Sequence, residues 1–339
     1  MKQKNKTKRQ KRSLNSSLIG LVATIPIHML NWGNLNAVQA ATSQSTVNFT
    51  QSVQNRRAVH ANKGEATTQS GICDNDLPHK LDAIVNAPRF STAKWGISIE
   101  SLSSPTTLYS HNPDDLLIPA SNIKLLTTSA ALQIINRRNL RDFTALERWL
   151  GVVNRESDND YADALLHRIG GRNSVVRVLT PLGVSSDGYV QVDGSGLSRG
   201  NRAKPSTMVT LLKRMHSDDE DSLFYNSLPI AGVNGTLNHR FLNTPIKGKV
   251  HAKTGTLRGV KALSGYLESK NYGTVVFSII VNQSKQSDEV LTRAIDRIVL
   301  QTAQVRQCGE VKALSNQLIN QIMENGKIAF KFIDSLRDR

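Results

Sequence analysis

The chain has 339 residues, with 43 Lys or Arg against 27 Asp or Glu and a formal net charge of +16 at pH 7. That length is sufficient for a full hydrophobic core divided between two lobes. Its two cysteines are too few for an all-thiolate structural zinc site and its eight histidines form no H-E-x-x-H motif, so we expect neither a metal nor a cofactor.

Residues 1–40 have the layout of a secretory signal peptide. Residues 1–12 hold seven Lys or Arg and no acid, residues 17–30 are mostly apolar, and small residues follow at 37–41. The apolar run is short for a bilayer span, and an uncleaved membrane anchor is the alternative. We therefore expect an exported protein of the periplasm or cell envelope, with the polar residues 41–76 as a flexible linker.

The remaining chain is also basic. Because the signal peptide carries seven of the sixteen net positive charges, about nine remain after its removal. A surface of that charge suits anionic wall polymers or a membrane face, because opposite charges attract over a long range. Peripheral contact with a membrane is therefore one expectation. Nucleic acid is the rival partner, and both the export signal and the lack of a recognition motif in the sequence argue against it.

The first expected helix covers residues 77–85, and another follows the S-N-I-K motif of residues 121–124, where Pro119 ends the preceding structure. In a helix that begins at Ser121, Lys124 lies one turn on and on the same face, so its amine can reach the serine hydroxyl. A serine hydroxyl is a weak nucleophile until a base removes its proton. We interpret Ser121 as a nucleophile and Lys124 as its base. The alternative is a helix N-cap at Ser121 and a solvated lysine.

The Ser157-Asp158-Asn159 motif precedes another expected helix, and one or two helices are expected in residues 125–156 between the motifs. The hydroxyl of Ser157 can pass a proton toward a leaving amine, and the amide of Asn159 can hold both Lys124 and a substrate carbonyl. We therefore add Ser157 and Asn159 to the catalytic residues. A helix cap is the alternative interpretation of the motif, and the two roles are compatible.

The Lys253-Thr254-Gly255 motif is expected on a strand at the edge of an antiparallel sheet. Two stretches rich in β-formers follow it, at residues 263–267 and 275–281. A glycine on such a strand lets a ligand approach the backbone closely. The third motif is therefore interpreted as one wall of a binding site.

Lys253, Thr254, Gly255 and Thr256 are the expected substrate-binding residues. Lys253 is also the expected second cation near Lys124, because burial and a neighbouring positive charge both lower the pKa of a lysine, and only a neutral amine is a base. The alternative is that Lys253 is an edge-strand charge that prevents aggregation.

Together the three motifs resemble those of class A β-lactamases and penicillin-binding proteins. Further segments are similar to those of the D-alanyl-D-alanine carboxypeptidase/endopeptidase family of class C low-molecular-mass penicillin-binding proteins, over about residues 77–305. These segments are Asp193 to Arg199 with Asn201-Arg202, Ala231 to Leu237, and Lys253 to Leu257. The resemblance implies an α/β (α+β) fold of the β-lactamase/transpeptidase type. It implies an antiparallel sheet flanked by helices and a helical lobe at about 122–235, within a peptidase domain of residues 77–308.

One departure from that family is the short run between the first and second motifs, where members often carry a long insertion. Only residues 125–156 separate the motifs here. The accessory domains are therefore expected to be absent. Their absence leaves substrate range and the oligomeric state open and predicts a more open cleft.

The resemblance implies hydrolysis of peptidoglycan stem peptides through an acyl-enzyme, in which Ser121 attacks the carbonyl between two D-alanines. It implies an oxyanion hole made of the backbone N–H groups of Ser121 and Thr256. Lys253, Thr254 and Thr256 would hold the terminal carboxylate of the substrate, and β-lactams would acylate Ser121. Action on cross-linked peptides as a DD-endopeptidase is a further implied activity.

Two other functions share these motifs. A class A β-lactamase needs a glutamate base for the deacylating water, whereas the loop from Asp193 to Asn201 has no Glu, and Asp193 is interpreted as a turn residue. Glu220 lies in an acidic run typical of a solvated surface turn. We therefore favour the peptidase over the β-lactamase. The second alternative is a non-enzymatic protein that binds the cell wall or senses β-lactams.

Cys73 and Cys308 flank the expected first and last helices, at 77–85 and about 291–305. The resemblance implies that these helices pack together on one face of the sheet. An oxidising compartment would then allow a disulfide, and two free thiols are the alternative. Residues 309–339 lie beyond the resemblance and have apolar residues at helical spacing, which predicts a packing helix or a membrane-lying one.

Overall fold

The computed structural model describes residues 71–104, 106–137, 143–218, 222–308 and 321. The expected signal peptide, nearly all of the expected linker, Glu220 and the C-terminal extension except residue 321 lie outside the described residues. Within the described ranges, no helix is both long and apolar enough to cross a membrane.

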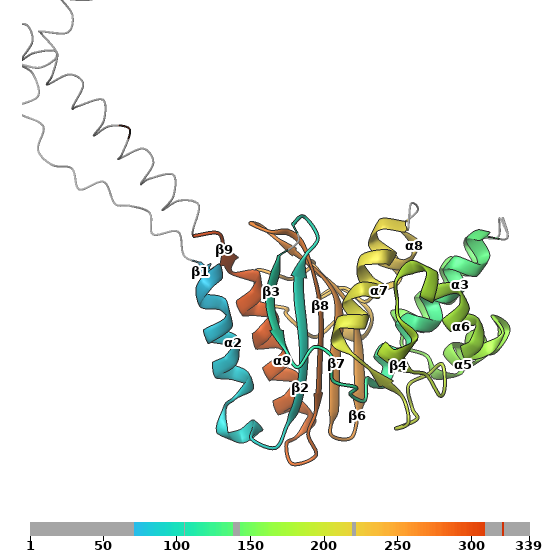
Figure 1. Ribbon diagram of the computed structural model, residues 1–339, viewed down its shortest axis with the longest axis horizontal. Helices are drawn as coiled ribbons and strands as arrows, with labels where there is room; N and C mark the ends of the chain where they lie inside the picture. Colours follow the sequence, from blue (N-terminus) through green and yellow to red (C-terminus); the bar gives the residue numbers. More distant parts are fainter. Residues whose placement is uncertain (1–70, 105, 138–142, 219–221, 309–320, 322–339) are drawn as a thin grey trace, which may run out of the picture. The chain divides into compact units, whose positions relative to one another are not determined.

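A five-stranded antiparallel sheet lies at the centre of the fold (Figure 1). Its strands have the spatial order β3-β2-β8-β7-β6, and each neighbouring pair is antiparallel. β6 is therefore an edge strand, which confirms the position predicted for the third motif. β7 and β8 contain the two stretches predicted as strands. The bounds are β2 Lys94–Ser101, β3 Thr107–His111, β6 Val250–Leu257, β7 Val260–Ser269 and β8 Gly273–Asn282.

Helices cover both faces of the sheet, which explains why its inner strands are so apolar. β8 is buried along nearly its whole length, as expected of a strand covered on both sides. On one face, α2 (Leu77–Val85) and α9 (Asp288–Ala303) join the strands in one hydrophobic cluster. On the other face, α7 (Pro205–Asp218) packs against β2 and β8. The first and last helices are thus found where the sequence predicts them.

The helical lobe follows the first motif along the chain and lies beside the β6 edge (Figure 1). Residues 125–156, expected to form one or two helices, contribute to two, α3 and α4. The lobe has its own hydrophobic cluster, in which α3, α6 and α7 meet. Its helices are α3 Lys124–Arg137, α4 Phe143–Asn154, α5 Asn159–Arg168, α6 Gly171–Leu179, α7 Pro205–Asp218 and α8 Leu223–Ser227.

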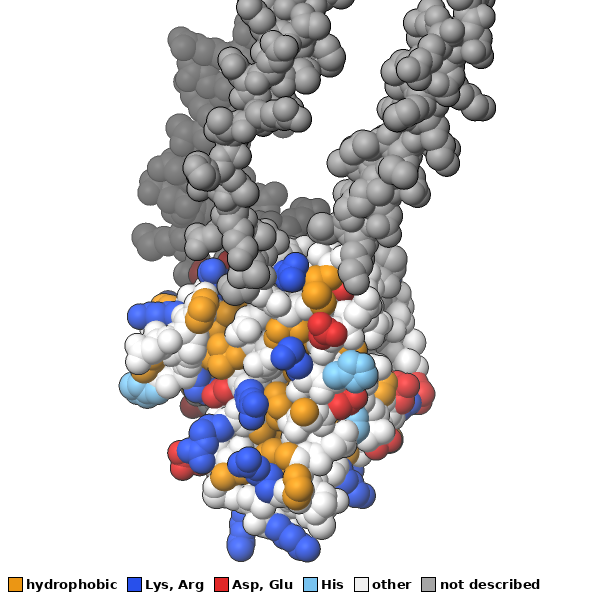
Figure 2. Space-filling view, turned by 90° about the vertical axis from the view of Figure 1, so that its left-hand side faces the viewer, with side chains coloured by type: hydrophobic (Ala, Val, Ile, Leu, Met, Phe, Trp, Pro, Cys, Tyr) orange, Lys and Arg blue, Asp and Glu red, His pale blue; other side chains and the backbone are white. Residues whose placement is uncertain are grey.

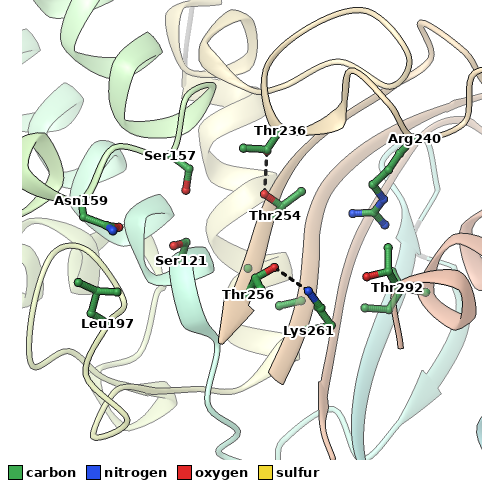
Figure 3. Close-up of a pocket in the computed structure, with 13 residues that line it drawn as sticks. Ser121, Ser157, Asn159, Leu197, Thr236, Arg240, Thr254, Thr256, Lys261 and Thr292 are labelled. Atoms are coloured by element: carbon green, nitrogen blue, oxygen red, sulfur yellow. Dashed lines mark hydrogen bonds between the residues drawn. The ribbon is translucent and has the colours of Figure 1, made fainter. Parts of the chain in front are cut away.

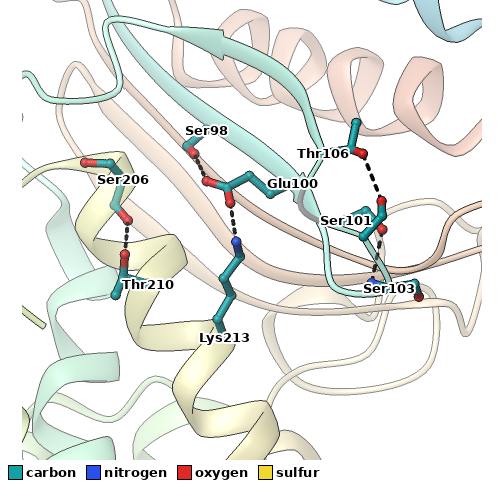
Figure 4. Close-up of polar contacts among 9 residues, drawn as sticks. Ser98, Glu100, Ser101, Ser103, Thr106, Ser206, Thr210 and Lys213 are labelled. Carbon is teal, nitrogen blue, oxygen red and sulfur yellow. Dashed lines mark hydrogen bonds and ion pairs between the residues drawn. The ribbon is translucent and has the colours of Figure 1, made fainter. Parts of the chain in front are cut away.

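Polar contacts fix α7 on the sheet. Lys213 of α7 forms an ion pair with Glu100 of β2 (Figure 4). Ser98, two residues earlier on that strand, donates a hydrogen bond of 3.2 Å to Glu100 Oε1. From β7, the hydroxyl of Tyr266 donates to the carbonyl of Leu212 at 2.7 Å. Two strands therefore hold the same helix, which limits sliding of the lobe along the sheet.

The face formed by α2 and α9 carries clustered Lys and Arg side chains over its lower part (Figure 2). A groove between these helices is lined by apolar residues together with Arg89, Arg293 and Arg297. The basic composition of the chain is thus visible as positive surface, which attracts anions over a long range.

The two ends of the described domain are joined covalently. Cys73 and Cys308 form a disulfide with a Cα–Cα distance of 5.3 Å, so the oxidised alternative is confirmed. Beside it, β1 (Ile72–Cys73) pairs in parallel with β9 (Val305–Arg306). Residues 71–76 are therefore structured, unlike the flexible linker expected for 41–76. Composition does not reveal this structure, because the disulfide partner of Cys73 lies 235 residues further along the chain.

Reduction of this disulfide should destabilise the domain by about 2–5 kcal/mol, because the closed loop no longer restricts the unfolded chain. Thermal unfolding followed by circular dichroism, with and without a reductant, measures the effect. The Cys73→Ala/Cys308→Ala double variant should melt near the reduced wild-type chain and should not respond to the reductant. Equal melting temperatures for the oxidised and reduced wild-type protein would contradict this prediction.

Candidate functional site

Ser121 lies at a sharp turn that leads into the helical lobe. It belongs to a short 3-10 helix, η4 (Ala120–Ile123), which runs directly into α3. The expected helix therefore begins as a tighter turn. Ala120 has a φ of +48°, a left-handed conformation that is uncommon for a residue with a Cβ. Within this turn, Ser121 lines a cavity, whereas the next two residues, Asn122 and Ile123, are buried.

The side chain of Lys124 is fully buried, and its amine has three oxygen neighbours. Lys124 Nζ lies 3.0 Å from Ser121 Oγ and 2.8 Å from Asn159 Oδ1, and it also donates to the main-chain carbonyl of Ser195. The two carbonyl oxygens can only accept, so they take the two N–H bonds of a neutral amine. The lone pair of that amine then faces the Ser121 hydroxyl. This is the arrangement that a base for Ser121 requires.

Burial also lowers the pKa of Lys124, to about 8. Three carboxylates, those of Asp163, Asp193 and Asp158, oppose the shift by attracting the charged form. A lysine with this pKa is partly neutral near pH 7, whereas an ordinary surface lysine is almost entirely charged.

The second motif surrounds the start of α5. Asp158 is the N-cap of that helix, and its carboxylate accepts a hydrogen bond of 2.8 Å from the backbone N–H of Tyr161. The capping role considered for the motif thus falls on Asp158, while Ser157 and Asn159 line the cavity. Ser157 has a φ of +62°, and such strained positions are often found at functional sites.

Lys253 is the second fully buried lysine. Its amine lies 2.7 Å from Ser157 Oγ and 3.2 Å from the carbonyl of Thr254, and it is not among the residues that line the cavity. The amine therefore contacts the second motif, and the expected contact of Lys253 with a substrate carboxylate stays a prediction. Burial first, and then repulsion from Lys124, lowers the pKa of Lys253 well below its usual value. The expected repulsion between the two lysines is thus present, with burial as the larger cause.

Asn122, the residue after Ser121, joins the turn to the sheet, and its side chain has no exposed surface. With the amide oriented to match donors with acceptors, Nδ2 donates to the carbonyls of Lys253 at 2.9 Å and Thr254 at 3.3 Å, and Oδ1 accepts from Ser264 Oγ at 2.6 Å. A buried amide needs such partners. Asn122 therefore fixes the nucleophile turn against the third motif, a role for which a single asparagine gives no sequence signal.

Asp193 organises the loop of residues 193–201. Its carboxylate accepts hydrogen bonds from the backbone N–H groups of Gly196 at 2.7 Å and Ser198 at 2.6 Å. It also accepts from the side chain of Asn201 at 2.8 Å. The interpretation of Asp193 as a turn residue is confirmed.

Asp163 of α5 holds the same loop from the lobe side. It accepts hydrogen bonds from the backbone N–H groups of Gly194 at 2.7 Å and Ser195 at 2.8 Å. These bonds fix the Ser195 peptide whose carbonyl contacts Lys124. Asp163 gave no sequence signal, because it lies outside the three motifs and its partners are 31 and 32 residues away.

Two glycines allow other backbone segments to approach the Ser121 turn. A Cβ on Gly196, which has a φ of +87°, would lie 2.2 Å from the carbonyl oxygen of Ala120. A Cβ on Gly255 would lie 2.5 Å from the carbonyl oxygen of Pro119. The close approach predicted for Gly255 is therefore present, and here the approaching group is the chain's own backbone.

The three motifs meet at a cavity of about 340 Å³ (Figure 3). Six of the eight predicted residues line it, and the other two, Lys124 and Lys253, lie buried beside it. The six are Ser121, Ser157, Asn159, Thr254, Gly255 and Thr256. No carboxylate is among the lining residues that the structure describes. The described ranges also contain no cluster of three or more His, Cys, Asp or Glu suited to a metal ion.

Four polar residues of the cavity were not predicted: Thr236, Arg240, Lys261 and Thr292. Thr236 accepts a hydrogen bond of 2.7 Å from Thr254 Oγ1, and Lys261 donates one of 3.2 Å to Thr256 Oγ1 (Figure 3). The position of Lys261 could have been predicted from the sequence, because a tight hairpin after the third motif places Lys261 directly opposite Thr256.

Comparison with known proteins adds independent evidence. A model of the D-Ala-D-Ala carboxypeptidase 3 (S13) family matches residues 77–148 and 144–305. Over 174 residues the chain is 36% identical to penicillin-sensitive carboxypeptidase A of Dictyostelium discoideum. The matched region is 46% of this chain and 33% of that relative. Over 142 residues it is 41% identical to the D-alanyl-D-alanine carboxypeptidase of an Actinomadura species. That matched region is 37% of this chain and 26% of the relative. The chain thus matches about a third or less of the length of these relatives.

A β-lactamase from Chitinophaga pinensis is similar in structure, with a TM-score of 0.57 at 18% identity. The likeness covers 68% of this chain and 98% of that protein. At this level of identity it concerns the fold alone. It confirms the predicted fold, an antiparallel sheet flanked by helices.

Gly196→Ala should destabilise the domain more than Gly183→Ala. Both glycines have left-handed φ values, +87° and +84°, but a Cβ at Gly183 meets no atom within 4 Å. Gly183→Ala therefore measures the cost of the backbone conformation alone, about 1–2 kcal/mol. Gly196→Ala adds the clash with the Ala120 carbonyl. Urea unfolding of the two variants measures the difference, and equal losses would show that the 193–201 loop moves aside without resistance.

Proposed function

Because the chain belongs to the D-Ala-D-Ala carboxypeptidase 3 (S13) family, we propose that it is a serine carboxypeptidase that removes the terminal D-alanine of peptidoglycan stem peptides. The observation that carries the proposal is the buried amine of Lys124, 3.0 Å from the hydroxyl of Ser121. A serine needs an adjacent base to become an effective nucleophile. The other two neighbours of this amine direct its lone pair toward Ser121.

In the first step, Ser121 Oγ attacks the carbonyl carbon between the two D-alanines while Lys124 takes up the hydroxyl proton. The carbonyl oxygen becomes an oxyanion, for which the backbone N–H groups of Ser121 and Thr256 are the proposed donors. Thr256 lies on β6, whose partner strand in the sheet is β7, and the bridge on its outer side joins Ile230 to His251 at the other end of the strand. An edge strand leaves alternate N–H groups unpaired, so β6 can offer one to the substrate.

In the second step, the bond between the carbonyl carbon and the nitrogen of the terminal D-alanine breaks. The proton passes from Lys124 through the hydroxyl of Ser157 to that nitrogen, and D-alanine leaves. The amine of Lys253, 2.7 Å from Ser157 Oγ, orients this hydroxyl. Asn159 holds Lys124 in place at 2.8 Å. Water then hydrolyses the ester and restores Ser121.

A β-lactamase is the second function that the motifs allow. That reaction needs a carboxylate to activate the water that removes the acyl group. The described lining residues include no carboxylate, and Asp193 is committed to its own loop. The carboxypeptidase is therefore better supported, with β-lactams as inhibitors that acylate Ser121. A non-enzymatic sensor would have no need of the proton path through Ser157.

The proposal extends to the whole chain. Residues 77–308 are the catalytic domain, with the helical lobe at about 122–235, and residues 1–40 direct export to the periplasm or cell envelope. The disulfide supports export, because such bonds persist in oxidising compartments. DD-endopeptidase action on cross-linked peptides belongs to the proposal as well, and so does contact of the basic surface with the cell envelope.

Ser121→Ala should abolish covalent labelling by a fluorescent penicillin and release of D-alanine from a D-Ala-D-Ala peptide. The reason is that, in the described part of the chain, the Lys124 amine contacts the hydroxyl of Ser121 and no other hydroxyl. Gel fluorescence and a D-alanine assay measure the two activities. Ser91→Ala, at an exposed serine outside the cavity, is the control and should keep both.

The lifetime of the adduct separates the two candidate functions. After removal of free penicillin, mass spectrometry should find the acyl group still attached to Ser121 in the wild-type protein, because no carboxylate of the described residues lines the cavity. Rapid loss of the adduct with release of hydrolysed drug would favour the β-lactamase. Full labelling of a folded Ser121→Ala protein would exclude Ser121 as the nucleophile.

The rate of acylation should rise with pH and level off above a pH of about 8. Only the neutral amine of Lys124 accepts the Ser121 proton, and its pKa is lowered to about 8. Below that pKa the neutral fraction grows with pH, so the slope is positive. Stopped-flow measurement of kcat/KM between pH 6 and about 10 gives the profile.

Two aspartate variants on α5 test whether the neutral fraction of Lys124 sets the rate of acylation. Asp163→Asn keeps an oxygen acceptor for the 193–201 loop but removes a charge that raises the pKa of Lys124, so the rising limb should move to lower pH. Asp160→Asn, on the same helix but exposed, is the control and should leave the profile unchanged. Identical profiles for Asp163→Asn and the wild type would show that another group controls the rate.

A further inference from the structure

A second hollow, separate from the cavity of the three motifs, gathers positive charge. This basic hollow has a volume of about 550 Å³, and Lys94, Arg199, Arg258 and Lys285 all line it with exposed side chains. No described lining residue is acidic, and within the described ranges none of these four cations forms an ion pair. Four like charges around one hollow repel each other, so the hollow favours a negatively charged ligand.

Strand ends bring these cations together over a fixed floor. Lys94 begins β2 and pairs with Asn282 at the end of β8, and Asn282 also pairs with Val260, where β7 begins. The side chain of Asn282 donates to the carbonyl of Ile118 at 3.0 Å and accepts from its N–H at 2.9 Å. The hollow is therefore held by sheet register and by side-chain hydrogen bonds.

The groove between α2 and α9, lined in part by Arg89, Arg293 and Arg297, lies beside the basic hollow. Gln283 lines the hollow, and its side chain donates to the main-chain carbonyl of Arg89 at 3.3 Å. Gln286 donates to the same carbonyl at 3.0 Å. Both sites lie at the end of the sheet where β2 and α9 begin (Figure 1), so they form one positively charged end of the domain.

We propose that these two sites, the basic hollow and the α2–α9 groove, bind a linear phosphodiester polymer of the cell envelope. The inference rests on the export proposed above and is independent of the chemistry at Ser121. A small anion can occupy only one of the two sites, whereas a polymer with repeated charges can occupy both. Arginine suits phosphate in particular, because its planar guanidinium donates two parallel hydrogen bonds to phosphate oxygens.

The groove can exchange its existing ion pair for such a ligand. Arg293 pairs with Glu289 one turn away on α9, and the two side chains are 63% and 74% exposed. Exposed pairs of this kind contribute little to stability, so a phosphate can replace the carboxylate.

A bilayer surface fits this end of the domain less well. Helices that lie on a membrane insert apolar side chains into it. Among the described residues, none of the exposed large hydrophobic side chains lines either site. The cations also surround hollows, which a narrow polymer can enter and a flat surface cannot.

Binding at this end keeps the catalytic cavity close to the wall. Arg199 and Arg258 line the basic hollow, and Leu197 and Thr256, two residues before them, line the cavity. Attachment to the polymer therefore raises the local concentration of substrate in the same wall.

Fluorescence anisotropy with a labelled oligomer of glycerol phosphate measures this binding over a range of salt concentrations. Lys94→Gln/Lys285→Gln removes two cations from the hollow, and Arg89→Gln/Arg297→Gln removes two from the groove. Each double variant should weaken binding about 10-fold at low salt and reduce the slope of log K against log salt by about 1 to 2, because released counterions drive the association.

Arg172→Gln/Lys270→Gln is the matched control. It removes the same charge from exposed positions on α6 and in the β7–β8 turn, and binding should stay nearly unchanged. All of these variants should keep D-alanine release from a short peptide, because none of the substituted residues lines the catalytic cavity. Melting temperatures check the fold, and Lys94→Ala/Lys285→Ala replaces the hollow variant if that variant unfolds.

Each result decides between the possibilities. Equal weakening by the control and the test variants would overturn the proposal, since net charge alone would then explain binding. Tighter binding to phosphatidylglycerol vesicles, single-stranded DNA or polygalacturonate would overturn it in favour of a membrane, a nucleic acid or a carboxylate polymer. Polymer binding without D-alanine release by the wild type would support the site and overturn the proposed peptidase. D-alanine release without polymer binding would overturn the site and leave the peptidase intact.

Discussion

Two lysine amines without exposed surface, those of Lys124 and Lys253, impose the constraint that the rest of the site satisfies. Burial of an unpaired charge costs several kcal/mol, so each amine must be surrounded by oxygen atoms. Lys124 receives them from η4, from α5 and from the 193–201 loop. Lys253 receives them from the second motif and from its own strand. The need to surround two amines therefore brings the helical lobe and the edge of the sheet together.

That convergence requires backbone segments to approach one another more closely than side chains allow. Gly196 and Gly255 provide the space on two sides of the Ser121 turn, because a Cβ at either position would meet a carbonyl oxygen. Asn122 then fixes the turn to β6 through the carbonyls of Lys253 and Thr254. The position of the Ser121 turn is thus set by main-chain packing and by the Asn122 hydrogen bonds.

The same constraint divides the cavity into two ends of different character. At the Ser121 end the lysines are buried and their pKa values are lowered, which favours the neutral amine that accepts a proton. At the other end, Lys261 and Arg240 form ion pairs with Asp288 and Asp296. Among the described residues, the cavity therefore has two unpaired buried amines beside one end and two ion-paired cations at the other.

Local sequence patterns determined a large part of this protein. The helices at 77–85 and after Ser121, the strands after Lys253, and the reach from Lys124 to Ser121 follow from helix and strand periodicity, which depends only on residues close together in the chain. The order of the three motifs supplied the resemblance that implied the α/β fold, and six of the eight motif residues line one cavity. Tertiary structure decided which oxygen atoms surround each amine. Lys124 depends on a carbonyl 71 residues away, Lys253 on a hydroxyl 96 residues away and Asn122 on a hydroxyl 142 residues away. It also decided that the amine of Lys253 contacts Ser157 and that Lys261 lines the cavity. Burial and hydrogen-bond partners arise only when distant segments pack together, and no local periodicity encodes that packing.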